Sequence, residues 1–154
     1  MKHITLPPGI KSLRKVERSR EMECAYLYTS SEVMEIPLDE TIILNKNGYI
    51  TDEIYHNEGA DKVRFGKRGL YRISFVIHAI NESVFALTVN DRIVSNSMAR
   101  NVVGNKLIGQ SIIQIEENDY LQIRNCSGKN IVLNCFAGGA QRNVRVSLIV
   151  EQIE

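Results

Sequence analysis

Residues 69–79, GLYRISFVIHA, alternate between apolar and more polar side chains near the middle of the 154-residue chain. In an extended strand, successive side chains point to opposite faces. One face of such a strand would carry Tyr71, Ile73, Phe75, Ile77 and Ala79. The other face would carry Arg72, Ser74, Val76 and His78. The apolar face predicts packing against a hydrophobic core, and the pattern alone leaves open whether the second face meets water or another copy of the protein.

Short strands separated by turn residues are predicted over most of the chain beyond Cys24, with no convincing helix among them. Asn47-Gly48 and Asn90-Asp91 are residue pairs suited to turns that need a positive φ. The pattern indicates an all-β sandwich or barrel. The expected strands span residues 25–29, 41–44, 53–57, 62–65, 70–80, 84–90, 93–97, 107–116, 120–125, 131–136 and 144–152.

The same alternation marks two further expected strand regions. Near the C-terminus the inward residues would be Val144, Val146, Leu148 and Val150, with Arg145, Ser147, Ile149 and Glu151 on the other face. Around a turn at 117–119 the inward residues would be Ile113, Ile115, Leu121 and Ile123. These side chains extend the core predicted from residues 69–79.

The composition favours one soluble globular domain, with 44% hydrophobic and 24% charged residues. The 19 Lys and Arg nearly balance the 18 Asp and Glu, so no overall field attracts nucleic acid or an anionic membrane. We expect no membrane insertion, because no run of 18 apolar residues exists. The N-terminus has no apolar signal-peptide core, so we expect cytoplasmic synthesis without classical secretion.

Residues 1–23 differ in character from residues 24–154, which form the expected globular domain. The segment KSLRKVERSR at 11–20 is strongly basic and follows Pro7-Pro8-Gly9. Ile10, Leu13 and Val16 recur every three residues, which allows a short helix. We favour a solvated basic arm. Nucleic-acid binding is the alternative, but no aromatic residue is interleaved there to stack on bases.

No catalytic or metal-binding motif is found, so we expect a non-enzymatic protein without a cofactor. His3, His56 and His78 do not form a His-x-His pair, and no Gly-x-Ser-x-Gly is present. We interpret His56 as one half of an ordinary surface pair with Glu58, and His78 as a structural or interface residue. The paired acids lack the alternating spacing of a dedicated calcium loop.

The cysteines are Cys24, Cys126 and Cys135, an odd number without metal-ligand spacing. If SGKN at 127–130 is a tight hairpin, Cys126 faces a residue near Ile131, and Cys135 lies several residues further along the ladder. At about 3.3 Å per residue that separation is too great for a disulfide. We therefore predict free thiols.

The order of motifs resembles the jelly-roll domains of the tumour necrosis factor-like superfamily. The motifs, in chain order, are GLYRISFVI, FALTVNDRIVSNS, GQSIIQIEENDYLQIRN and VSLIVEQI. Within that superfamily the sequence is most similar to the globular heads of the first complement component and to bacterial collagen-like and exosporium (spore-surface) head domains. Asn118-Asp119 stands where the family usually has Gly-Asp, and Asn90-Asp91 where it often has Asn-Gly. Asn and Asp tolerate left-handed backbone, so the turns remain possible.

The resemblance implies a two-sheet antiparallel jelly-roll sandwich that assembles as a homotrimer, with one sheet of each protomer facing a three-fold axis. The core-facing residues that it implies on those strands are Tyr71, Ile73, Phe75, Ile113, Leu148 and Val150. An arginine on the axial side would need a partner or trapped water. The implied axis-facing residues are Arg72, Ser74, Val76, Ile108, Gln110, Ser147 and Ile149.

Three functions are compatible with these observations. The first is a non-enzymatic structural or surface module of a spore or cell surface. The second is a soluble ligand or receptor-binding head whose outer loop, SNSMARNVVGNK at 95–106, contacts a protein partner through Met98, Arg100, Val102 and Val103. The third and weakest is a jelly-roll enzyme.

Overall fold

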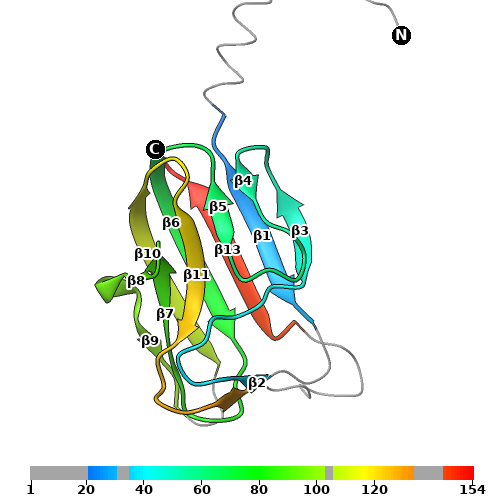
Figure 1. The fold of residues 1–154 in the computed structure, drawn as a ribbon, viewed down its shortest axis with the longest axis vertical. Coiled ribbons are helices and arrows are strands. Elements are labelled where there is room, and N and C mark those ends of the chain that lie inside the picture. The colour runs from blue at the N-terminus through cyan, green and yellow to red at the C-terminus, as the bar shows by residue number, and fades with distance from the viewer. Residues whose placement is uncertain (1–20, 31–34, 103–105, 134–143) are drawn as a thin grey trace, which may run out of the picture.

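The computed structural model describes residues 21–30, 35–102, 106–133 and 144–154, which form two antiparallel sheets packed face to face (Figure 1). Sheet I has the strand order β10-β6-β13-β1-β3. Its strands are β1 (Cys24–Thr29), β3 (Lys46–Ile50), β6 (Gly69–Ile77), β10 (Leu107–Ile115) and β13 (Val146–Gln152). The two-sheet antiparallel sandwich predicted from the sequence is confirmed.

Sheet II has the order β4-β5-β11-β7-β8, with β9 also paired to β7. A short pair, β2 (Glu35–Ile36) with β12 (Ile131–Val132), lies apart from the two sheets, and η1 (Ser95–Ser97) is a single 3-10 turn. The strands of sheet II are β4 (Ile54–Tyr55), β5 (Val63–Phe65), β7 (Val84–Val89), β8 (Arg92–Ile93), β9 (Ala99–Arg100) and β11 (Tyr120–Asn125).

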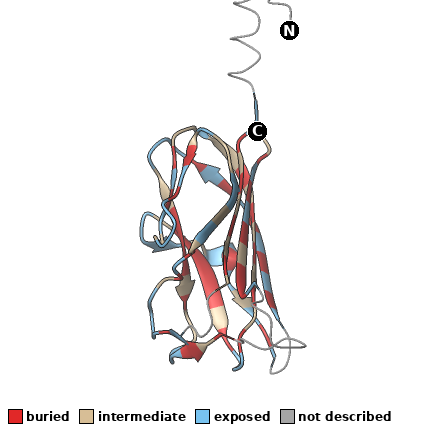
Figure 2. Cartoon of the chain, turned by 90° about the vertical axis from the view of Figure 1, so that its right-hand side faces the viewer, coloured by how far each residue is buried: buried red, intermediate tan, exposed pale blue. Residues whose placement is uncertain are grey.

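Alternation along β6 separates core from surface as the sequence predicts. Tyr71, Ile73, Phe75 and Ile77 are fully buried between the sheets, and Ala79 beyond the strand is buried too. The residues between them are only half-buried. Figure 2 shows this alternation of buried and less buried residues along the strands of the sandwich. The inward residues of β10, β11 and β13 join the same core, including Ile113, Ile115, Leu121, Ile123, Leu148 and Val150.

Gly109 allows the two long strands β6 and β10 to pair closely. It lies directly opposite Phe75 in the register and faces the core. A Cβ added at this position would come within 2.2 Å of the Phe75 ring. The phenylalanine ring therefore occupies the space that a side chain at 109 would fill.

Two predicted turns are confirmed by backbone geometry. Asn90 and Asp91, between β7 and β8, have φ of 51° and 66°. Asn118, between β10 and β11, has φ of 73°. These are left-handed conformations, in which Asn and Asp replace glycine at the lowest cost among other residues.

Several sequence-based expectations are wrong. Asn47-Gly48 lies inside β3 and forms no turn, because this segment pairs with β1. Residues 41–44 make only isolated bridges at Thr41 and Leu44. The expected strand at 93–97 is mostly the 3-10 turn η1.

The C-terminal alternation also begins later than expected. β13 starts at Val146, so Val144 is exposed, and Arg145 is fully buried instead of facing outward. The main-chain groups of Arg145 bond Thr29 and His78, which fixes this residue beside the end of the sheet. The short helix considered at 10–16, Val103 and Cys135 lie outside the described residues.

Candidate self-association surface

The seven residues that the resemblance places toward an axis lie together on the outward face of sheet I. Register joins them into cross-strand rows, because Val76 lies between Ile108 and Ser147, and Ser74 lies between Gln110 and Ile149. Arg72 occupies the next row. We call the outward residues of β6, β10 and β13 the sheet I surface. Its role in assembly stays a prediction.

This surface exposes three isoleucines. Ile108 is 61% exposed, Ile112 is 50% exposed and Ile149 is 40% exposed. Each points away from the core on a strand whose alternate residues are buried. Sequence reasoning missed Ile112 as a surface residue, although its place between the inward Ser111 and Ile113 would have identified it. Neighbouring exposed apolar side chains on a sheet are typical of an interaction surface.

Arg72 has a partner within its own protomer. Its guanidinium lies 3.6 Å from Glu151 of β13, the residue directly opposite it in the register. Both side chains are half-exposed. The arginine can therefore lie in an interface without leaving its charge unpaired. The sequence alternation places Glu151 on the outward side of its strand, and the structure adds it to the sheet I surface beside the seven axis-facing residues.

Tyrosines extend the sheet I surface onto β1 and β3. Tyr26 lies opposite Ile149 and Tyr28 opposite Ser147, and the two rings stack with centroids 5.4 Å apart. Tyr49 of β3 pairs with Tyr26 and is itself well exposed. Tyrosine is enriched at protein interfaces because its ring is large and rigid and keeps a polar end.

Two histidines have different environments. His78, just beyond β6, is half-buried, and burial together with nearby Lys106 lowers its pKa. His56 is buried, and its ring contacts Asn47 Oδ1 and the carbonyl oxygen of Ala60. The surface pair expected between His56 and Glu58 is therefore wrong, since Glu58 instead accepts a hydrogen bond from the Asn47 main chain.

The predicted partner loop is partly regular structure. Met98, Arg100 and Val102 are exposed, as the second hypothesis requires, and β9 within this region pairs with β7. Ser97 anchors η1 by accepting a hydrogen bond from the Leu87 main chain. Val103 is outside the described residues.

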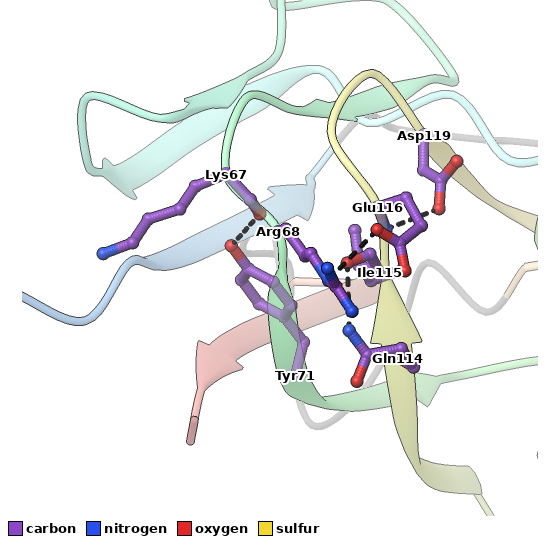
Figure 3. A network of polar contacts seen from close by, with 7 residues as sticks. All are labelled: Lys67, Arg68, Tyr71, Gln114, Ile115, Glu116 and Asp119. Atoms are coloured by element: carbon purple, nitrogen blue, oxygen red, sulfur yellow. Dashed lines mark hydrogen bonds and ion pairs between the residues drawn. The ribbon is translucent and has the colours of Figure 1, made fainter.

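Polar contacts at the start of β6 are structural in character (Figure 3). Tyr71 donates its hydroxyl to the Lys67 carbonyl at 2.8 Å, and Arg68 pairs with Glu116 at 3.2 Å. These bonds hold the β5–β6 connection beside the β10–β11 turn. No group of three or more His, Cys, Asp or Glu side chains placed to hold a metal ion occurs in the described parts of the chain.

Cys24 and Cys126 carry free thiols. Burial raises the pKa of the Cys126 thiol, while Arg124 acts in the opposite direction. Within the described ranges no helix is long and apolar enough to cross a membrane.

The strand order and two-layer packing define a jelly roll of the tumour necrosis factor and complement C1q type. Similar solved structures include the Eiger TNF of S. frugiperda, with a TM-score of 0.64, 10% identity and coverage of 88% of this chain and 94% of that chain. The globular domain of zebrafish complement 1qA protein has a TM-score of 0.60 and 10% identity, covering 85% of this chain and 95% of that chain. Murine APRIL at pH 8.5 has a TM-score of 0.55 and 9% identity, covering 86% and 100%.

At these identities the likeness shows the fold. No protein-family model and no curated protein matches the chain.

Proposed function

We propose that the protein is a non-enzymatic homotrimer that serves as a structural or surface-binding module. The sheet I surface of each protomer would lie against its neighbours around a three-fold axis. The observation that carries this proposal is the set of three exposed isoleucines on β10 and β13, two strands whose alternate, inward residues are all buried.

The chemistry of the surface favours burial in an assembly. Covering apolar area contributes roughly 25 cal/mol per Å², so side chains as exposed as Ile108 and Ile149 gain stability when a partner covers them. The charges on the same surface are paired as Arg72 and Glu151. The three-fold arrangement follows from the sequence resemblance, which implies edge-to-face packing of protomers.

Native mass spectrometry tests this assembly. We expect peaks at one and three times the chain mass of 17.5 kDa, with no abundant dimer, because a cyclic trimer loses two interfaces when one subunit leaves. A spectrum with monomer alone, or with dimer as the largest species, would contradict the proposal.

We also propose that the protein lies in the surface layer of a spore or of a cell envelope. It rests on the resemblance to exosporium head domains. Antibody labelling of intact spores and cells tests it. Labelling only after lysis would count against a surface role.

A second candidate is binding of a partner protein through the outer loop. The observation that favours it is the exposure of Ile93, Met98 and Val102 around η1. Replacing Met98 and Val102 by Ser should leave the trimer mass unchanged if this loop serves a partner. A fall to monomer mass would show that the loop belongs to the self-association surface instead.

A further inference from the structure

Asn47-Gly48 is the one Asn-Gly pair in the chain, and it lies in β3, an edge strand of sheet I (Figure 1). Asn-Gly is the residue pair most prone to deamidation, because glycine has no side chain to hinder attack by its own main-chain nitrogen on the preceding amide. The pair forms no turn here, so turn geometry does not account for its glycine.

The ring of Tyr26 accounts for the glycine instead. Asn47 and Tyr49 lie opposite consecutive residues of β1, so Gly48 between them is the extra residue of a β-bulge. A Cβ added at Gly48 would lie 2.6 Å from Cδ1 of the Tyr26 ring. The ring occupies the space of a side chain at position 48, and the packing of this edge therefore keeps a glycine directly after Asn47.

The side chain of Asn47 is held by His56, in the connection between β4 and β5. Its Nδ2 donates to the His56 carbonyl at 2.8 Å, and its Oδ1 contacts Nδ1 of the His56 ring. The main-chain N–H of Asn47 donates to Oε2 of Glu58 at 3.0 Å. The buried His56 ring also contacts the Ala60 carbonyl through Nε2, which fixes it in place. We call the three contacts of Asn47 the β3 clamp.

Deamidation needs only water as a co-reactant. The main-chain nitrogen of Gly48 loses its proton to water and attacks Cγ of Asn47. The new N–C bond closes a cyclic succinimide, and the side-chain nitrogen leaves as ammonia. Water then opens either carbonyl of the ring. One product is an aspartate, and the other is an isoaspartate, whose main chain is longer by one methylene.

The β3 clamp keeps the reacting atoms apart. Both polar atoms of the Asn47 amide are engaged by His56, so Cγ does not turn toward the nitrogen of Gly48 while these contacts last. Attack therefore requires local opening of β3. Most residues of this strand are at least half-exposed, and it pairs with β1 at the border of the sheet, so opening it costs less than opening a central strand.

We propose that Asn47 is a deamidation site protected by the β3 clamp, and that its conversion irreversibly releases β3 from the connection at 56–60. After conversion an oxygen takes the place of Nδ2, so the hydrogen bond to the His56 carbonyl becomes a contact between two acceptors. The new carboxylate also lies near that of Glu58, which repels it. An isoaspartate lengthens the strand at its bulge as well. The proposal does not depend on trimer formation.

Peptide mapping by mass spectrometry tests the protection. It follows conversion at Asn47 in the full-length protein during incubation at neutral pH. The free peptide of residues 43–52, ILNKNGYITD, gives the unprotected rate. We expect the folded protein to convert at least about tenfold more slowly than the peptide, because the reaction waits for local opening. Equal rates would overturn the protection.

Glu58→Ala tests the clamp itself. It removes one contact at an exposed residue, so the fold should be kept, and conversion of Asn47 should become several-fold faster than in the unaltered chain. Glu82→Ala, the matched loss of an exposed carboxylate between β6 and β7, should leave the rate unchanged. Conversion in Glu58→Ala that is no faster than in Glu82→Ala would overturn the clamp.

Hydrogen exchange tests the release of β3. Protein aged until Asn47 has converted should exchange its amides at 46–50 several-fold faster than fresh protein, with β6 unchanged. Asn47→Ser, which lacks the reacting amide, is aged in the same way and should show no such change. Unaltered exchange at 46–50 after conversion, or an equal change in aged Asn47→Ser, would overturn the release.

Discussion

The outward face of sheet I leaves isoleucines open to solvent, whereas the central strands of sheet II, β7 and β11, carry outward polar side chains that their own neighbours bury. On sheet II, Thr88 is fully buried and Gln122 is 5% exposed, and Gln122 donates to Asp61 at 2.8 Å. Lys62 lies over the Tyr120 ring, 4.7 Å from its centroid. Sheet I has no comparable cover over Ile108, Ile112 and Ile149 within the described residues.

The difference predicts which of the two sheets would be covered if the protein self-associates. The central strands of sheet II, β7 and β11, are covered by their own chain, and they tolerate the cost of three buried polar atoms without partners, on Thr88, Gln122 and Arg124. Sheet I has its charges paired and its apolar side chains uncovered. Removing apolar surface from water is the larger driving force for association, so the sheet I surface is the one expected to bind a second copy.

The largest expected effect on assembly comes from introducing one arginine on the outward face of either sheet. Ile149→Arg on sheet I should abolish assembly, because three arginines would be buried near the axis without new partners. Ile93→Arg is the matched change on sheet II, where the isoleucine is 46% exposed. It should leave the mass unchanged in light scattering. If light scattering gives the same mass for both variants, the proposed difference between the two sheets would be wrong.

A second test separates the inward and outward sides of β10. Gly109→Ala should lower the free energy of unfolding by about 1–3 kcal/mol, because the new Cβ meets the Phe75 ring at the centre of the core. Gln110→Ala, one residue on and outward, should change it little. Urea titration of both variants measures the difference, and a harmless Gly109→Ala would contradict the packing described here.

The elements of the fold differ in how well the sequence predicts them. Residues 69–79 are predictable because alternation, burial and strand length agree. Gly48 was misread because Asn-Gly commonly marks a turn, while here cross-strand pairing with β1 prevails over the local preference. The outward placement of Arg145 was wrong because the alternation was extended to Val144 and Arg145, which precede the first residue of β13.

The candidate site was partly predictable for the same reason. Alternation and the resemblance place seven residues on one face, and register then joins them into rows. The pairing of Arg72 with Glu151 needs the alignment of strands about 80 residues apart, which depends on tertiary structure.

A smaller effect is expected at Thr88 on sheet II. Thr88→Val should raise the free energy of unfolding by about 1 kcal/mol, because it removes a buried hydroxyl without a partner. Thr29→Val is the matched substitution on sheet I, where the hydroxyl donates to the Ile43 carbonyl at 2.7 Å. It should lower stability by about 1–3 kcal/mol. The same sign at both sites in thermal unfolding would contradict the hydrogen-bond assignments.

The smallest expected effect is a pH dependence from His78. Its lowered pKa means that the folded protein binds fewer protons here than the unfolded chain, whose pKa is near 6.5. Stability should therefore fall as pH drops below about 6.5 and level off below the folded pKa. His78→Gln should flatten that part of the urea-unfolding profile. An unchanged profile would exclude His78 as its source.

Sedimentation equilibrium of the unaltered protein over a wide concentration range tests self-association through sheet I most directly. The account predicts a single mass close to three times 17.5 kDa at high concentration, falling on dilution toward the mass of one chain. A constant mass of 17.5 kDa at every concentration would contradict it.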